Sequence, residues 1–169
     1  MTKISLLLLF PTLILGQLTE DKLRALKVHN DARSEVGTPP LVWSENLEEQ
    51  ALKYAKQIAR TNNYKHSSTR DGENLAMFFE YEKHNKVKTY IYSATPLYDA
   101  SMAWYNEIKD YKYSKIKRFR IGPKIGHYTQ MVWKDTKEVG IASAVSKNGK
   151  VYVVARYYPI GNYLGEYPY

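Results

Sequence analysis

Residues 126–133 read Gly-His-Tyr-Thr-Gln-Met-Val-Trp and place one histidine, His127, among largely apolar neighbours. A second histidine and two glutamates stand in three other short motifs: His66 in Tyr-Lys-His-Ser, Glu73 in Gly-Glu-Asn-Leu-Ala and Glu107 in Trp-Tyr-Asn-Glu. An ionisable side chain in apolar surroundings is costly unless it is paired or bound to a metal. These two imidazoles and two carboxylates therefore predict a polar centre inside the fold.

Four blocks of sequence resemble the signature blocks of the CAP superfamily, which comprises cysteine-rich secretory proteins, antigen 5 and pathogenesis-related proteins. In chain order the blocks are residues 29–33, 72–76, 126–136 and 155–162. They follow the family order, span about residues 23 to 163, and are most similar to the cysteine-free Golgi-associated plant pathogenesis-related branch. The resemblance implies an α+β fold, a three-layer α/β/α sandwich with a mainly antiparallel central sheet.

The first 16 residues have the pattern of a signal peptide, with one cation, Lys3, before an apolar run that ends at Leu15. This run is too short to cross a bilayer, which takes roughly 20 apolar residues. We therefore expect cleavage between Gly16 and Gln17, secretion to the extracellular space, and a single CAP domain over residues 17–169.

The chain contains no cysteine, so a secreted domain must depend on its core alone, whereas small secreted domains commonly use disulfides. Ala155 stands where the late signature block of the family usually has a cysteine. Position 2 is Thr2, not the glycine that carries a myristoyl group in the intracellular relatives, so lipid anchoring of that kind is not expected.

Hydrophobic periodicity predicts three helices: residues 19–36, a second helix that begins after a Ser44 cap, and residues 97–111. On the third helix Glu107 falls on the same face as Trp104. An acid on an apolar face indicates a partner inside the protein.

Alternating apolar residues predict strands at 139–145 and 151–158, joined by a tight turn at Asn148-Gly149, with a shorter strand at 74–79. The resemblance implies that three polar residues of the first helix tie it to the sheet by hydrogen bonds and take no direct part in chemistry. These residues are His29, Asn30 and Arg33.

The resemblance also assigns the four residues of the polar centre to the family tetrad: His66, Glu73, Glu107 and His127. Two imidazoles offer zinc two nitrogen ligands, while the carboxylates hold water or fix the imidazole tautomers. A site with only two protein ligands should bind zinc weakly. The alternative is a satisfied polar cluster that merely holds the cleft together, and His84 is expected in a solvated loop.

The interval between Ala76 and Trp104 is long and rich in aromatic residues. In family members that bind sterols this interval forms a flexible loop beside the cleft. Aromatic side chains with a polar handle suit a sterol or fatty acid. The candidate lipid-binding residues are Phe78, Phe79, Tyr90, Ile91 and Tyr92. The alternative is an ordinary, partly buried loop whose tyrosines pack on the sheet.

The formal net charge is +8, and residues 109–124 contribute seven basic residues against one acid. This density favours an anionic membrane surface or a sulfated glycan as partner. The residues expected to bind that surface are Lys115, Lys117, Arg118 and Arg120. The alternative is a solvated connection, and secretion argues against nucleic acid.

Together these features predict a secreted CAP-domain protein that binds sterols or other lipids and has a cleft able to hold a divalent metal. The second hypothesis is an extracellular interaction protein, with a defence, venom or allergen-like role, that acts through protein or glycan contacts. A weak hydrolase is the third. Ser67 adjoins His66, but the chain lacks a nucleophile-elbow motif, so an enzyme is disfavoured.

Overall fold

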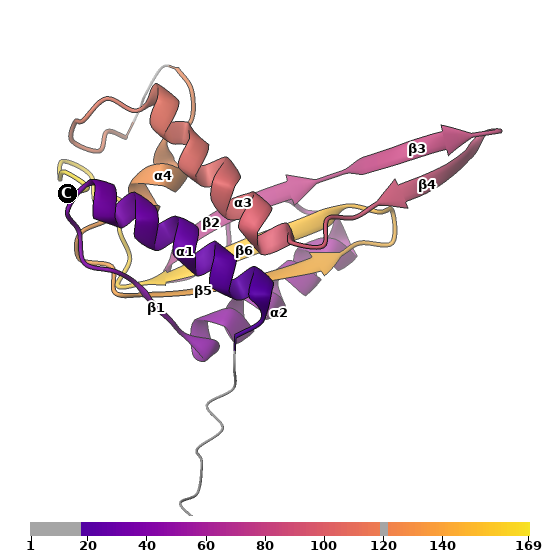
Figure 1. The fold of residues 1–169 in the computed structure, drawn as a ribbon, viewed down its shortest axis with the longest axis horizontal. Coiled ribbons are helices and arrows are strands. Elements are labelled where there is room, and N and C mark those ends of the chain that lie inside the picture. Colours follow the sequence, from indigo (N-terminus) through magenta and orange to yellow (C-terminus); the bar gives the residue numbers. More distant parts are fainter. Residues whose placement is uncertain (1–17, 119–121) are drawn as a thin grey trace, which may run out of the picture.

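The computed structural model describes residues 18–118 and 122–169 (Figure 1). The expected signal peptide, residues 1–16, and the expected anion-binding residue Arg120 lie outside the described residues. Among the described residues, no helix is long and apolar enough to cross a membrane. The elements, in chain order, are α1 (Glu20–Glu35), β1 (Val42–Trp43), α2 (Glu45–Thr61), β2 (Gly72–Phe78), β3 (Glu80–His84), β4 (Val87–Ile91), α3 (Pro96–Tyr105), the 3₁₀-helix η1 (Asn106–Asp110), α4 (Gly126–Met131), β5 (Glu138–Val145) and β6 (Val151–Tyr158).

A four-stranded sheet with the order β1-β5-β6-β2 forms the middle layer. β6 pairs antiparallel with both β5 and β2, and only the short β1 pairs parallel, with β5. Helix α2 covers one face of the sheet, while α1, α3 and α4 lie over the other (Figure 1). The predicted three-layer sandwich with a mainly antiparallel sheet is confirmed.

Helix α1 begins after Thr19, whose side chain accepts a bond from the Lys22 backbone N–H at 3.5 Å. Its buried Arg33 donates from Nη1 to the carbonyls of Met131 and Trp133, at 3.0 and 2.8 Å, and from Nη2 to the carbonyl of Thr136 at 2.9 Å. Buried polar groups need such partners. Arg33 therefore ties the helix to residues 131–136 and not to the sheet. The predicted bond to the sheet is made by His29, whose Nε2 lies 2.8 Å from the hydroxyl of Tyr157 in β6.

Helix α2 packs closely on β5 because the strand has a glycine at the crossing point. A Cβ on Gly140 would lie 2.1 Å from the backbone nitrogen of Glu48. The predicted side-chain cap is wrong in one respect: Ser44 occupies the N-cap position but its side chain makes no capping hydrogen bond. The backbone carbonyl of Ser44 accepts the Glu48 N–H at 3.0 Å instead.

The third helix and the strand predicted at 74–79 differ most from their predicted bounds. The third α-helix stops at Tyr105, and Glu107 lies on the 3₁₀-helix that follows. The strand predicted at 74–79 begins earlier, at Gly72, and ends at Phe78. Tight 3₁₀ turns are frequent at helix ends, where periodicity alone does not separate them from the α-helix.

The interval expected as a flexible loop contains a two-stranded antiparallel ribbon, β3–β4. Its turn residues, Asn85 and Lys86, have φ values of 48° and 66°, as a two-residue hairpin turn requires. His84 is solvent-exposed as predicted, but it pairs with Val87 in the ribbon and is not in a loop. The ribbon is exposed on both faces, so its sequence lacks the alternation that identifies a half-buried strand.

Candidate functional site

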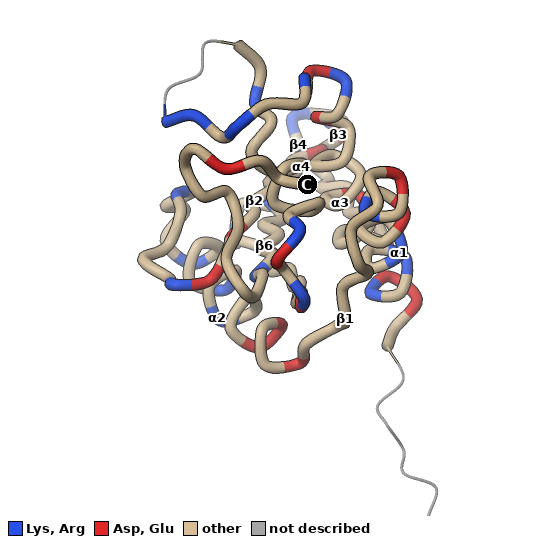
Figure 2. The backbone as a smooth tube through the Cα atoms, turned by 90° about the vertical axis from the view of Figure 1, so that its left-hand side faces the viewer, with Lys and Arg blue, Asp and Glu red and all other residues tan. Residues whose placement is uncertain are grey.

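A cleft of about 1020 Å³ opens at the start of β2, beside α4. His66, Glu73 and His127 line it, together with the segments 114–118 and 122–126. Figure 2 shows Lys and Arg along the chain on both sides of the gap at 119–121. The cleft therefore joins the predicted polar centre to the predicted basic run.

His66 is oriented by the buried carboxylate of Glu73. The two side chains meet at 2.6 Å between Nδ1 and Oε1, and Ser67 donates to the same carboxylate from its backbone N–H and its hydroxyl, at 3.0 and 2.8 Å. The Glu73 side chain is 4% exposed and that of His66 64%. The carboxylate is thus the fixed partner and the imidazole extends into the open cleft.

Glu73 also faces a buried cation. Nη1 of Arg156 lies 3.1 Å from Oε2 of Glu73, and the guanidinium lies over the ring of Tyr54 at 5.3 Å. Burial raises the pKa of Glu73, but the hydrogen bonds from His66 and Ser67 and the charge of Arg156 outweigh it and leave this pKa lowered. Glu73 therefore stays ionised in the folded protein.

His127 is held in the same way by Glu107. Nδ1 of His127 lies 2.6 Å from Oε1 of Glu107, whose Oε2 accepts the backbone N–H groups of His127 and Tyr128 at 2.9 and 3.1 Å. The 3₁₀-helix η1 brings the acid to this position beneath α4. The ring of buried Trp104 lies 6.2 Å from that of His127 and gives the imidazole an apolar neighbour.

Both imidazoles have their Nδ1 occupied by a carboxylate acceptor, so in the neutral ring Nε2 carries the free lone pair. Within the described residues neither Nε2 has a hydrogen-bond partner. A carboxylate that fixes a histidine tautomer is the usual second shell of a metal site. The donor set therefore fits a borderline-soft ion such as zinc, with two nitrogen ligands from the protein.

Glu73 and Glu107 orient the imidazoles, and they are not placed to act as metal ligands themselves. No group of three or more His, Cys, Asp or Glu side chains in residues 18–118 and 122–169 is placed to hold an ion. Any ion bound by His66 and His127 would take its other ligands from water or a bound molecule.

A second polar chain, which the sequence analysis did not identify, runs behind the cleft. Asn74 donates to the carbonyl of His127 at 3.1 Å and to the hydroxyl of Tyr157 at 3.0 Å. That hydroxyl lies 2.8 Å from Nε2 of His29, whose Nδ1 lies 2.9 Å from the carbonyl of Ala25. Burial lowers the pKa of His29 to about 4, so it is neutral and accepts the Tyr157 proton.

The five candidate lipid-binding residues do not form one surface. Phe78 packs against the core, and Tyr90 lies against Gly149, where an added Cβ would be 2.3 Å from its ring. Ile91 follows Tyr90 in β4 and so points to the opposite face of the ribbon, while Tyr92 is exposed.

The flexible loop beside the cleft that the resemblance implied is not found in the part of the chain that this structure describes. The cleft is at Gly72 and the ribbon follows Phe78, so the length of β2, about 20 Å at roughly 3.3 Å per residue, separates them (Figure 1). Local sequence patterns do not reveal this distance, because it depends on how far β2 extends before the ribbon begins.

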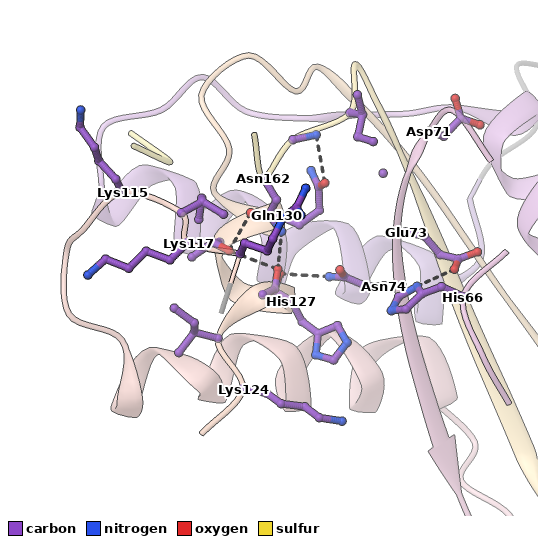
Figure 3. Close-up of a pocket in the computed structure, with 18 of the residues that line it drawn as sticks. His66, Asp71, Glu73, Asn74, Lys115, Lys117, Lys124, His127, Gln130 and Asn162 are labelled. Atoms are coloured by element: carbon purple, nitrogen blue, oxygen red, sulfur yellow. Dashed lines mark hydrogen bonds and ion pairs between the residues drawn. The ribbon is translucent and has the colours of Figure 1, made fainter. Parts of the chain in front are cut away.

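Three of the four candidate anion-binding residues line the cleft itself, and the fourth, Arg120, lies outside the described residues. Lys115, Lys117 and Arg118 belong to its wall, and Lys124, which was not among the predicted residues, joins them (Figure 3). The sequence signal for Lys124 was present, because it lies in the same basic run.

Comparisons with known proteins identify chains that are similar in sequence and in fold. The family model described as cysteine-rich secretory protein family, CAP, matches residues 26–157. Golgi-associated plant pathogenesis-related protein 1 of Homo sapiens is 39% identical over 145 residues, 83% of this chain and 84% of that protein. Pathogenesis-related leaf protein 4 of Solanum lycopersicum is 37% identical over 145 residues, 85% of this chain and 80% of that protein. The crystal structure of NaASP2 with Zn²⁺ has a TM-score of 0.71 at 26% identity and covers 91% of this chain and 87% of its own.

Proposed function

The chain belongs to the cysteine-rich secretory protein, or CAP, family, and from that premise we propose that its cleft binds a divalent metal ion, zinc first, through Nε2 of His66 and His127. One observation carries the proposal: each imidazole has its Nδ1 held by a carboxylate at 2.6 Å and lines the same cleft. The solved structure of NaASP2, which carries Zn²⁺, supports zinc as the first ion to test.

The bound ion would serve to bind a ligand. It would not take part in a hydrolysis reaction with a serine or threonine nucleophile. Ser67 directs its hydroxyl to Glu73, and Thr129 directs its hydroxyl to the carbonyl of Gly126 and to Asn162. Neither hydroxyl is hydrogen-bonded to the neighbouring imidazole, as an activated nucleophile would be. We therefore propose a binding protein, with hydrolase activity third.

Titration calorimetry tests the metal site. We expect zinc binding at neutral pH that weakens as the solution is acidified, because protons and metal compete for the same nitrogens. The variant with both His66→Ala and His127→Ala should lose the zinc isotherm. His84→Ala, which removes an exposed histidine from the ribbon, should retain it. An isotherm unchanged in the double variant would refute the site.

Secretion is the second part of the proposal. The apolar residues before Gly16 are the support for it, and the name of the human relative makes the Golgi the alternative location. Expression in a eukaryotic secretory host followed by amino-terminal sequencing should give a mature chain that begins at Gln17. Retention of the full chain inside the cells would contradict this.

The ribbon supports a second candidate function, the binding of a sterol or fatty acid. Phe79, Ile91 and Tyr92 are exposed apolar side chains, although they face different sides. Replacing these three with serine should weaken binding of a fluorescent sterol or fatty acid at least tenfold, since buried apolar area contributes about 25 cal/mol per Å². Tyr90 is left in place because it packs on Gly149. Undiminished affinity in this variant would remove the ribbon from lipid binding.

A further inference from the structure

One wall of the cleft carries a concentration of positive charge, and its lining residues described at 114–118 and 122–126 include no acid. Lys115, Lys117, Arg118 and Lys124 all line the pocket and are exposed to solvent. In the part of the chain that the structure describes, none of the four forms an ion pair. Like charges around one opening repel each other, and a bound anion relieves that repulsion.

The acids of the same cleft do not compensate this wall. Glu73 is already bound by His66, Ser67 and Arg156. Asp71 accepts a hydrogen bond from the hydroxyl of Thr69 at 3.3 Å. Both belong to the His66 side of the pocket, while Lys115 and Lys117 project on the other side of His127 (Figure 3).

We infer that the cleft binds a sulfated polysaccharide chain, with its sulfate groups on Lys115, Lys117, Arg118 and Lys124. The polysaccharide would bind in the same cleft as the proposed metal ion, so this inference builds on the proposed function. It does not require a bound metal, because the four cations line the cleft independently of the imidazole nitrogens.

The shape of the site favours a chain over a bilayer surface. The cations line a concave cavity of about 1020 Å³, which a flat membrane cannot enter. A polysaccharide, in contrast, can lie along a groove and place successive sulfates on successive cations. Sulfate esters are permanently charged at neutral pH and suit lysine as well as arginine donors.

An aromatic platform continues from the cationic wall. The rings of Tyr113 and Tyr167 are stacked, with centroids 4.9 Å apart and an interplanar angle of 20°, and they remain 57% and 38% exposed. Nζ of Lys115 lies 5.6 Å from the Tyr167 ring. Exposed aromatic faces with a polar edge suit the C–H faces of sugar rings beside their charged groups.

Backbone hydrogen bonds hold the wall and the platform together. The N–H of Ile116 donates to the carbonyl of Glu166 at 2.8 Å, and the N–H of Gly165 donates back to the carbonyl of Ile116 at 2.9 Å. The segment that carries Lys115 and Lys117 is therefore fixed to the segment that carries Tyr167. This arrangement presents cations and rings as one preformed surface.

The first test is calorimetry with a heparin decasaccharide in the presence of EDTA. The wall variant replaces Lys115, Lys117, Arg118 and Lys124 with glutamine and should bind at least about tenfold more weakly. The control variant makes the same change in charge on α2 and the β5–β6 turn, at the exposed residues Lys53, Lys56, Arg60 and Lys147, and should stay within about twofold of the unmodified protein. Equal losses in the two variants would mean that only net charge matters, which overturns the inference.

The second test locates the ligand and identifies its chemistry. The imidazole NMR signals of His127 should shift on addition of the decasaccharide, while those of His84 on the ribbon should not. An unsulfated heparosan oligosaccharide of equal length should bind at least about tenfold more weakly. Signals of His127 that stay fixed at saturation, or equal affinity for the unsulfated chain, would refute the proposal.

Two further experiments distinguish polysaccharide binding from metal binding and from membrane binding. The His66→Ala and His127→Ala double variant should lose zinc yet keep decasaccharide binding in EDTA, so the metal site can fail without this inference failing. Vesicles of phosphatidylserine and phosphatidylcholine should bind more weakly than the decasaccharide. Tighter vesicle binding that the wall variant abolishes would assign the cations to a membrane and overturn the glycan.

Discussion

The two ends of strand β2 differ in how their side chains are held. At the cleft end the side chains of Glu73 and Asn74 are buried, and each meets two or more hydrogen-bond partners. Beyond the other end the strands of the ribbon are exposed along almost their whole length. A buried polar group that loses its partner costs its full desolvation, whereas water replaces a partner lost at the surface. One strand therefore leads from a region that tolerates little change to one that tolerates much.

The largest contrast should come from the same substitution at both ends. Glu73→Gln removes the charge that faces buried Arg156, so we expect a loss of about 3 to 5 kcal/mol in the free energy of unfolding. Glu82→Gln, at an exposed ribbon position, should change it by less than about 0.5 kcal/mol. Urea unfolding followed by circular dichroism measures both. A loss below about 1 kcal/mol for Glu73→Gln would show that Arg156 does not depend on this carboxylate.

Acid should lower the free energy of unfolding through His29, which belongs to the polar chain behind the cleft. Its pKa is lowered from 6.5 to about 4, so between these values the unfolded chain binds a proton that the folded protein does not. Stability should therefore fall as the pH decreases from about 6.5 to about 4, by about 3 kcal/mol in total. The lowered pKa of Glu73 adds a further loss as the pH falls through its folded value, below the ordinary 4.5.

Unfolding free energies measured across this pH range check the effect. His29→Gln cannot take up the proton and should flatten the dependence above about pH 5, whatever its own cost. His84→Ala, on the ribbon, should leave the slope as it is. An unchanged slope in His29→Gln would assign the acid sensitivity to other groups.

A smaller effect is expected where the ribbon contacts the sandwich. Gly149→Ala would place a Cβ 2.3 Å from the Tyr90 ring at a residue with φ of +83°. We expect a loss of about 1 to 2 kcal/mol, from backbone strain and displacement of the ring. Gly165→Ala, with φ of +85° and open space at the Cβ position, suffers only the strain. The difference between their thermal unfolding midpoints measures the Tyr90 contact, and equal midpoints would mean that the ring moves away without cost.

The smallest effect is a gain within the ribbon. Lys83 and Lys88 face each other across β3 and β4, and like charges in directly opposite positions repel. Lys83→Glu should stabilise the protein by a few tenths of a kcal/mol, about 0.2 to 0.5. Lys86→Glu, in the turn and without an opposite residue, should give less. Differential scanning calorimetry can compare the two, and a larger gain from Lys86→Glu would point to a general effect of net charge.

The same contrast explains how much could be predicted from the sequence. Helix α1, helix α2 and strands β5 and β6 were predicted because each buries one or both faces and therefore shows periodicity. The polar centre was predicted because acids and imidazoles in apolar motifs need partners, but which glutamate meets which imidazole became visible only in the structure. The ribbon was missed because neither of its faces is buried.

Longer-range features of the site were beyond the reach of local patterns. The chain through Asn74, Tyr157 and His29 joins three elements whose side chains meet only in the folded sandwich. The basic wall was visible as a run of charge, but its position inside the cleft depends on the pairing of Ile116 with residues 165 and 166. No periodicity in the run reveals that pairing.

The turn of the ribbon offers a place to modify the protein without disturbing either layer of helices. Asn85 and Lys86 are exposed and connect two paired strands whose ends are already close together. Exposed turns of this kind accept inserted residues more readily than elements whose backbone is buried. A fluorescent label or an affinity tag placed between them would project from the end of the molecule remote from the cleft, which makes the ribbon a natural handle for immobilising the protein with its cleft free.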